Sequence, residues 1–381
     1  MRIAYIIDSL SYRGGAERII TEKANYLAGL DGYDVTIIVC YGFSEPAPVV
    51  YHISDKVRQI SLNVRYHSQY RYRYPRRLLV KWQLNRQLKR SMKEAVETVN
   101  PDIIIVPGYN LADTVCRLHI KAAKIVESHE ARPFTKSGQL YSHTALSRLF
   151  MRIYRAFYLH TVECNADVVV TLTQGDAWEW RKARRVEVIP NYSFMNVTAL
   201  TDGSSKRAIA VGRLDWQKGF DRLIEAWKLV NRRHPDWHLD IYGSGVLESE
   251  LRKAIADAQP CNADIHPFTP DISACYAESS VYLMTSRFEG FGLVLLEAMK
   301  HGLPCVAFDC RYGPADIIAD GRSGYIVADG DIKSFADRVC TIIENPQTWK
   351  SMSAEGIKRA EAYNLEAIMN QWTALFSKLC P

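Results

Sequence analysis

Short apolar runs alternate with amphipathic stretches along the first half of the chain. Each run is rich in Val, Ile and aromatic residues and ends at polar or glycine residues, as a buried strand does. Between runs, stretches such as residues 16–30 repeat apolar positions at helical spacing. The predicted strands are residues 2–8, 34–41, 102–108, 124–129, 167–173 and 186–191. Fully apolar strands alternating with helices predict a parallel sheet that helices cover on both faces.

The second half of the chain starts the same pattern again. Its predicted strands are residues 208–214, 238–245, 280–286, 304–309 and 324–329. Helical spacing recurs between them, for example at 219–233 and 331–345, whereas residues 191–207 show no clear period. The fold class is therefore α/β with two Rossmann-like domains. The predicted domains are an N-terminal domain at 1–192, a linker at 193–205, a C-terminal domain at 206–362 and a final helical segment at 363–381. The final helix packs on its own domain or returns to the first one.

Length and composition agree with a two-domain globular protein. The 381 residues exceed what one core usually serves, and the 48% hydrophobic and 24% charged content are ordinary. We find no uninterrupted apolar stretch of the roughly eighteen residues that a membrane span needs. The start, MRIAYIIDSL, resembles a first strand more than a signal peptide. The nine cysteines form no CxxC pair, which favours reduced thiols in a cytoplasmic protein.

The net charge of +6 is unevenly distributed, with a balance of +10 over residues 1–195 and −4 over 196–381. Residues 66–99 and 148–160 are dense in Arg, Lys and aromatic residues, a combination typical of interfacial helices. We therefore expect an anionic membrane surface as a partner, with a solvated helix face as the alternative. No RNA-binding motif is recognised, so nucleic acid is not expected.

Two strand-to-helix turns are candidates for anion binding. Gly14 and Gly15 follow the first strand, where the absence of Cβ atoms and a helix N-terminus would let phosphate approach the backbone. A bare turn would have the same sequence. Arg213 and Lys218 follow a strand of the second half and precede Gly219 and a helix. Two cations at that position would form a diphosphate clamp.

The stretch SRFEGFGLVLLEAMKHG (286–302) carries two carboxylates in an otherwise apolar run. If most of the segment is helical, Glu289 and Glu297 lie about 10 Å apart, which fits a nucleotide sugar across the helix start. Gly290 and Gly292 allow the tight loop between them. The backbone amides that would face the diphosphate are those of Phe291, Gly292 and Leu293. The alternative is a solvated loop charge and a surface helix residue, but Glu297 lies among apolar residues where an unpaired carboxylate is costly.

Together these motifs resemble the retaining glycosyltransferases of family 4, which have the GT-B fold of two facing Rossmann-like domains. The family pattern E-x7-E corresponds to Glu289 and Glu297, and its Arg–Lys pair to Arg213 and Lys218. Its N-terminal Gly-rich loop corresponds to Gly14 and Gly15. The resemblance covers nearly the whole chain, including 188–191, 241–245 and 312–318.

The resemblance implies site roles. Arg213 and Lys218 would stabilise the leaving diphosphate, Glu289 would position the donor sugar, and Glu297 would bind the ribose. His129, at a strand end in the first domain, would contact the donor sugar as well. Gly243 and Phe268 are further donor-binding candidates, the latter for the base. The resemblance also places the loop at Gly313 near the donor. Asp316 stands where the family usually has Glu, which leaves its role open.

The resemblance further implies the partners. We expect transfer of a hexose-type sugar from a nucleotide sugar, UDP rather than GDP, to a lipid-linked saccharide in surface polysaccharide or glycan assembly. The protein would act at the cytoplasmic face of the membrane, without a metal or other cofactor. An epimerase, a phosphorylase or a non-catalytic membrane- or nucleic-acid-binding relative remain alternatives. The DGD at 329–331 resembles a metal-binding DxD, but its place between a strand and a helix predicts a turn and a helix cap.

Overall fold

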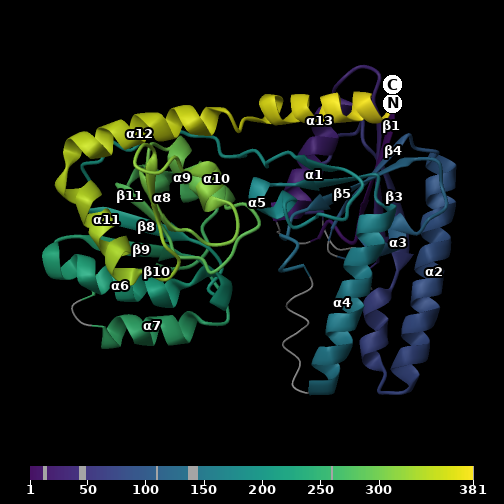
Figure 1. Ribbon diagram of the computed structural model, residues 1–381, viewed down its shortest axis with the longest axis horizontal. Helices are drawn as coiled ribbons and strands as arrows, with labels where there is room; N and C mark the ends of the chain where they lie inside the picture. Colours follow the sequence, from purple (N-terminus) through teal and green to yellow (C-terminus); the bar gives the residue numbers. More distant parts are fainter. Residues whose placement is uncertain (12–14, 43–48, 109, 136–144, 259–260, 381) are drawn as a thin grey trace. The chain divides into compact units, whose positions relative to one another are not determined.

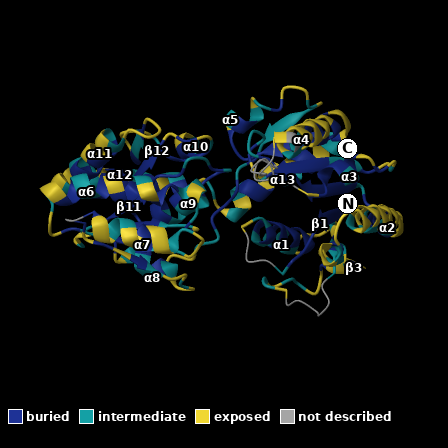
Figure 2. Cartoon of the chain, turned by 90° about the horizontal axis from the view of Figure 1, so that it is seen from below, coloured by how far each residue is buried: buried dark blue, intermediate teal, exposed yellow. Residues whose placement is uncertain are grey.

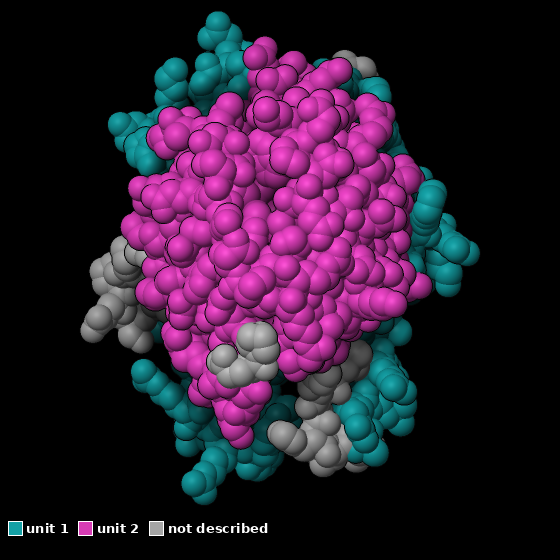
Figure 3. Space-filling model, turned by 90° about the vertical axis from the view of Figure 1, so that its left-hand side faces the viewer, with its two compact units in different colours: residues 1–171, 176–189, 371–381 teal, residues 172–175, 190–370 magenta. Residues whose placement is uncertain are grey.

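The computed structural model describes residues 1–11, 15–42, 49–108, 110–135, 145–258 and 261–380. The chain divides into two compact units, coloured separately in Figure 3. Unit 1 comprises Met1–Thr171, Asp176–Ile189 and Gln371–Pro381, and unit 2 comprises Leu172–Gly175 and Pro190–Asn370.

Unit 1 contains a seven-stranded sheet in the order β3-β2-β1-β4-β5-β6-β7. Every neighbouring pair is parallel. The strands are β1 (Arg2–Ile7), β2 (Asp34–Tyr41), β3 (Arg58–Val64), β4 (Ile103–Pro107), β5 (Ala123–Ser128), β6 (Val168–Thr171) and β7 (Val186–Val188). Because the helices leave little of the central strands exposed, β1 and β4 are almost completely buried, as their apolar sequences predict.

The helices of unit 1 connect successive strands. They are α1 (Gly15–Ala28), η1 (Tyr66–Arg71), α2 (Arg76–Val99), α3 (Ala112–Cys116) and α4 (Ala145–Asn165). The short α5 (Gln174–Ala177) follows β6.

Unit 2 contains a six-stranded parallel sheet in the order β10-β9-β8-β11-β12-β13. Its strands are β8 (Arg207–Val211), β9 (His238–Tyr242), β10 (Ala263–His266), β11 (Val281–Met284), β12 (Cys305–Phe308) and β13 (Gly324–Val327). Its helical elements are η3 (Trp216–Lys218), α6 (Phe220–Arg233), α7 (Glu248–Asp257), α8 (Ile272–Ala277), α9 (Leu293–Lys300), α10 (Pro314–Ile317), α11 (Ile332–Glu344) and α12 (Pro346–Glu361).

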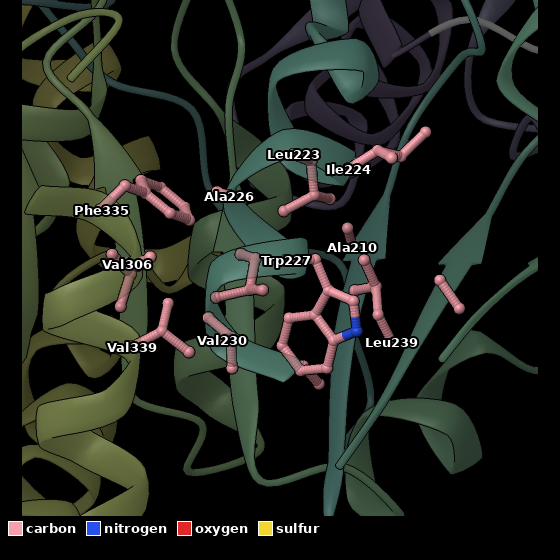
Figure 4. Packing of buried hydrophobic residues seen from close by; sticks show 14 of the residues in the cluster. Ala210, Leu223, Ile224, Ala226, Trp227, Val230, Leu239, Val306, Phe335 and Val339 are labelled. Carbon is pink, nitrogen blue, oxygen red and sulfur yellow. The ribbon is translucent and has the colours of Figure 1, made fainter. Parts of the chain in front are cut away.

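One core cluster of unit 2 lies between its sheet and the helices α6 and α11, and a second includes α9. Figure 4 shows Trp227 of α6 beside Ala210 and Leu239 of two strands, with Phe335 of α11 in the same cluster. The indole of Trp227 is fully buried, and its Nε1 donates to the carbonyl of Asn262 at 2.9 Å. The one polar atom of this large side chain is thus hydrogen-bonded, as a buried indole requires.

The chain passes between the units more than once. Residues 193–205 belong to unit 2, where Thr201 is buried and its amide donates to the carbonyl of His301 at 3.0 Å. The last helix, α13 (Leu365–Leu379), begins in unit 2, and from Gln371 on it belongs to unit 1. The chain therefore passes between the units within α13, and also after Thr171, Gly175 and Ile189.

The N-terminal halves of α2 and α4 stand clear of the core. In Figure 1 both helices extend below the sheet of unit 1, and Figure 2 shows their exposed faces. Residues 76–87 of α2 contain no buried position, and the first buried residue of the helix is Leu88. Apolar side chains are strongly exposed on both helices, among them Leu78, Leu79, Trp82, Leu149, Phe150, Ile153 and Phe157. No helix among the described residues is long and apolar enough to cross a membrane.

Candidate functional site

A buried lysine–glutamate pair lies at the carboxyl edge of the sheet of unit 2. Lys218 ends η3, just after β8, and Glu289 lies in the loop after β11. The Lys218 Nζ is 2.7 Å from the Glu289 Oε1, and the Ser286 hydroxyl donates to the same oxygen at 2.6 Å. The two charged side chains are only 15% and 7% exposed. Ligands of doubly wound sheets bind at this edge, so the pair marks a candidate site.

Arg213 lies on the same edge but is not part of the pair. Its guanidinium contacts Asp215 at 3.2 Å and donates to the Gln217 side chain at 2.9 Å, and it is 71% exposed. Gln217 in turn donates to the carbonyl of Phe288, next to Glu289. The structure therefore brings Lys218 to Glu289 directly, and Arg213 only through the Gln217 bridge.

Glycines allow the loops at this edge to approach one another. The stem of Lys218 lies against Gly212, where an added Cβ would be 3.2 Å from three side-chain carbons. A Cβ on Gly243, after β9, would be 1.9 Å from the carbonyl oxygen of Gly212. The predicted donor-binding role of Gly243 is thus accompanied by a close backbone contact that only glycine permits.

The loop before α9 is held by a second glycine contact. Gly292 caps α9 with a φ of 96°, a conformation that glycine adopts without strain. The backbone at Gly313 lies so close to the loop before α9 that an added Cβ would be 1.9 Å from the carbonyl oxygen of Phe291. Backbone hydrogen bonds join Glu289 to Arg311 and Tyr312 on the same two loops. The first amides of a helix have no partner within it, so those at Gly292 and Leu293 can serve an anion.

Glu297 lies on α9, within a polar cluster that the sequence did not reveal. The hydroxyl of Tyr276 donates to its carboxylate at 3.3 Å, and burial, with the Glu297 charge adding, raises the pKa of Tyr276 well above its usual value. The His301 Nδ1 lies 2.7 Å from the Glu297 carbonyl, and its Nε2 lies 2.7 Å from the Ser273 hydroxyl. Burial lowers the pKa of His301, so the neutral ring donates from Nδ1 and accepts at Nε2.

The remaining candidates in unit 2 differ in their exposure. Phe268 follows β10 and is 64% exposed, so its ring is accessible to a base. Phe291 is buried and packs against the Tyr363 ring with centroids 5.9 Å apart, so only its backbone can meet a ligand. Gly290, between Glu289 and Phe291, is half-buried.

In unit 1, polar side chains gather where β1, β4 and β5 end. His129 follows β5, and its Nε2 lies 3.1 Å from the Oε2 of Glu127. Asp8 follows β1 and accepts a hydrogen bond of 2.6 Å from the Asn110 side chain. Burial raises the pKa of Glu17 on α1; the neighbouring Asp8 adds to the rise, and His129 opposes it. Glu17, Asp8 and His129 therefore share one electrostatic environment.

The glycine loop of unit 1 is only partly described. Gly14 lies outside the described residues. Gly15 begins α1, and an added Cβ there would meet nothing within 4 Å. The described protein atoms thus leave open space at Gly15.

The DGD segment is a turn and a helix cap, as predicted. Asp331 caps α11 by accepting a hydrogen bond from the Ser334 amide, and Asp329 pairs with Arg222 at 2.6 Å. A separate group, His234, Cys340 and Glu344, lies close enough together to hold a metal ion. It lies at the ends of α6 and α11, and Glu344 is already paired with Arg233 at 2.8 Å. Because helices of this fold end at the opposite edge from the strands' carboxyl ends, this group is not part of the site.

Three contributors were not predicted from the sequence: Ser286, Gln217 and Tyr276. Ser286 precedes Glu289 by three residues in a loop, a spacing from which a hydroxyl can reach a carboxylate. No local pattern connects Gln217 or Tyr276 to the residues they contact, which lie 71 and 21 positions away.

Comparison with known families and proteins gives consistent results. A model of the glycosyl transferases group 1 family matches residues 198–359, and a model of glycosyltransferase family 4 matches residues 13–192. An uncharacterized glycosyltransferase of Haemophilus influenzae is 26% identical over 98% of this chain and 99% of its own. The amylovoran biosynthesis glycosyltransferase AmsD of Erwinia amylovora is 28% identical over 99% of each.

Among solved structures, a variant of Staphylococcus aureus TarM is similar over almost the full length. Its crystal contains fondaparinux, α-GlcNAc-glycerol and UDP. The TM-score is 0.76 at 14% identity, covering 98% of this chain and 99% of that one. This likeness shows the fold, and it confirms the predicted GT-B class of two Rossmann-like domains with parallel sheets.

Proposed function

The chain belongs to the glycosyltransferases of family 4, and we propose that it moves a hexose-type sugar from a UDP-sugar to a lipid-linked saccharide with retention of anomeric configuration. The product would enter the assembly of a surface polysaccharide or glycan. The observation that carries the proposal is the buried Lys218–Glu289 pair at the carboxyl edge of unit 2, beside the N-terminus of α9.

The pair suits a donor with a sugar on one side and a diphosphate on the other. Lys218 and Ser286 both contact the Oε1 of Glu289, so its Oε2 would accept a hydrogen bond from a sugar hydroxyl. The ammonium of Lys218 would then lie between this carboxylate and the leaving diphosphate. An ammonium in a half-desolvated site stabilises charge developing on a leaving group more strongly than it would in water.

The other candidates have supporting roles in the proposal. Arg213 is exposed and would swing from Asp215 to the diphosphate when donor binds. Glu297, held by Tyr276, would accept from the ribose hydroxyls. Two cations and the α9 amides would neutralise the diphosphate, so we propose that no metal or other cofactor is needed. His129 of unit 1 would contact the donor sugar.

The choice of UDP and of a saccharide product rests on relatives. The TarM variant was crystallised with UDP and α-GlcNAc-glycerol, and AmsD is described as acting in amylovoran biosynthesis. The proposal of a lipid-linked acceptor is based on the surface of unit 1. From Lys56 to Lys93 the chain contains no acidic residue, and the exposed start of α2 combines Arg76, Arg77 and Lys81 with Leu79 and Trp82. Such a surface would hold the protein at the cytoplasmic face of an anionic membrane.

The experiment is UDP release and saccharide transfer by wild type, Glu289→Gln and the matched control Glu250→Gln, an exposed residue of α7. With a panel of UDP-sugars and a lipid-linked saccharide extract, wild type and control should turn over. The rate of transfer by Glu289→Gln should be lower by at least about a hundredfold, which corresponds to an activation free energy higher by about 2.7 kcal/mol. The ¹H coupling constant of the anomeric proton should report the donor's configuration in the product.

Other outcomes would replace the proposal. Unchanged turnover in Glu289→Gln would remove the carboxylate from the mechanism. Inverted product would contradict retention. A C2-epimerised sugar would indicate an epimerase, and a visible-edge absorbance from pyridoxal phosphate on a lysine would indicate a phosphorylase. Absence of turnover with every donor would favour a non-catalytic relative.

A further inference from the structure

A lysine occupies a core position of α1. Ile19, Lys23 and Leu27 recur at a spacing of four on one helix face, and all three are at most 1% exposed. The Lys23 Nζ lies 2.5 Å from the Oε2 of Glu127, a residue of β5 that is equally buried. Burying two charges is costly, and the attraction between them does not reliably offset that cost. An apolar pair of similar volume would serve packing at least as well, so packing alone gives no reason for this pair.

Glu127 connects the lysine to His129. The same Oε2 that contacts Lys23 lies 3.1 Å from the His129 Nε2. Two hydrogen bonds fix the backbone between these residues. The His129 amide donates to the Glu127 carbonyl at 3.1 Å, and the Gly108 amide donates to the same oxygen at 2.7 Å. Among the described residues, neither the Oε1 of Glu127 nor the Nε2 of His129 has a hydrogen-bond partner, so Glu127 and His129 meet in a close polar contact without hydrogen-bond geometry. Burial alone would raise the pKa of Glu127, but Lys23 and His129 together hold it at about 2, so the group is a carboxylate at neutral pH.

The lysine is also covered by an aromatic ring from the end of the chain. The Nζ of Lys23 lies 4.0 Å from the centroid of the Trp372 ring, within the range of a cation–π interaction. Trp372 is 2% exposed and belongs to the part of α13 that lies in unit 1. A continuous series of contacts therefore runs from α13 through α1 and β5 to His129.

We propose that Lys23 and Glu127 are positioning residues for His129, with Trp372 fixing the lysine. The contact with the carboxylate holds the imidazole in one orientation with Nε2 toward Glu127, which leaves Nδ1 for the substrate side. Lys23 fixes the carboxylate through its own contact with the same Oε2. A carboxylate that fixes the orientation of a histidine ring determines which ring nitrogen faces the substrate. The inference rests on the proposed function, because it assigns a purpose to the orientation of His129 in that reaction.

The test separates positioning from stability. Lys23→Met and Glu127→Gln each leave one buried polar group without its partner, and both should lower the thermal midpoint and the kcat for UDP release. The double variant Lys23→Met/Glu127→Gln removes both charges, so its midpoint should recover toward wild type. Its kcat should stay at least about tenfold low, which corresponds to about 1.4 kcal/mol, with the KM for donor changing far less. If kcat recovers together with the midpoint, the pair is only structural and the inference is overturned.

Two further variants distinguish a failure of this inference from a failure of the proposed function. The double variant Arg207→Met/Asp240→Asn removes another buried carboxylate's ion pair, at the amino end of β8, and should keep wild-type kcat. His129→Asn should lose turnover as the positioning variants do. Turnover that survives His129→Asn would remove His129 from the reaction and overturn the inference, while leaving the Glu289 result intact. Loss in His129→Asn without loss in Glu127→Gln would overturn the inference alone.

A spectroscopic arm tests the positioning even without turnover. In the wild-type chain, the ¹⁵N signals of the His129 imidazole should be those of one fixed ring environment. In Glu127→Gln and in the double variant these signals should shift and broaden, because the ring loses its fixed orientation. Identical imidazole signals in wild type and both variants would overturn the inference, whatever the enzyme assays give.

Discussion

Glu289 is a buried carboxylate whose charge is balanced by one ammonium and one hydroxyl. Replacing Lys218 would leave that charge unpaired, which commonly costs about 3–5 kcal/mol. Keeping the pair contributes little net stability, because desolvation offsets much of the attraction. The pair is therefore better explained by a ligand that uses both groups than by the stability of unit 2. The glycines around it, at positions 212, 243, 292 and 313, permit the loops to close on it.

Gly313 offers a direct test of this loop packing. Gly313→Ala combines a φ of 112° with a Cβ 1.9 Å from the Phe291 carbonyl oxygen, whereas Gly321→Ala has a φ of 70° and open space. In the control variant Gly321→Ala, the free energy of unfolding should fall only by the cost of the left-handed conformation, about 1–2 kcal/mol. In Gly313→Ala, the free energy of unfolding measured in urea should fall by at least about 2 kcal/mol more than in the control, because overpacking displaces the Glu289 loop. Equal losses would mean that the contact between the two loops is unimportant.

At the scale of elements, the apolar strands could be predicted from the sequence and two strands could not. β2 was predicted with its observed bounds, and the other central strands within a few residues. β3 and β10 were missed because their exposed positions carry Arg58, Gln59 and Asp264, so that no continuous apolar run forms. Among site residues, each loop was predictable from strand-end glycines and charges. The Lys218–Glu289 contact was not, because it joins positions 71 residues apart.

The projecting ends of α2 and α4 are the elements whose surface predicts a partner. The chain should co-sediment with vesicles containing phosphatidylglycerol and not with phosphatidylcholine alone, since each Lys or Arg near an anionic surface contributes about 1 kcal/mol. Leu79→Ser/Trp82→Ser should weaken binding at least tenfold, because each exposed apolar side chain contributes on the order of 1.5–3 kcal/mol when buried. Trp178→Ser, also strongly exposed in unit 1, is the matched control. Equal binding by both variants, or binding to RNA in place of vesicles, would contradict the proposed membrane surface.

At the scale of the whole molecule, two parallel sheets and a shared C-terminal helix form one chain. The repeated strand–helix pattern predicted both sheets, because a parallel sheet needs apolar strands and covering helices. The sequence left open where α13 packs, since its apolar face would suit either unit. In the structure its last part belongs to unit 1, where Trp372 covers Lys23. Such contacts between distant segments follow from the folded arrangement and have no local sequence signal.

The most direct test of the central claim is thermal unfolding of the intact chain with UDP, GDP or neither. A nucleotide at about 100 times its dissociation constant adds about 2.7 kcal/mol, which raises the midpoint by several degrees for domains of this size. We expect a rise with UDP that is much reduced in Lys218→Ala. A rise with GDP alone would contradict the choice of donor, and an unchanged midpoint with either nucleotide would contradict a functional donor site in unit 2.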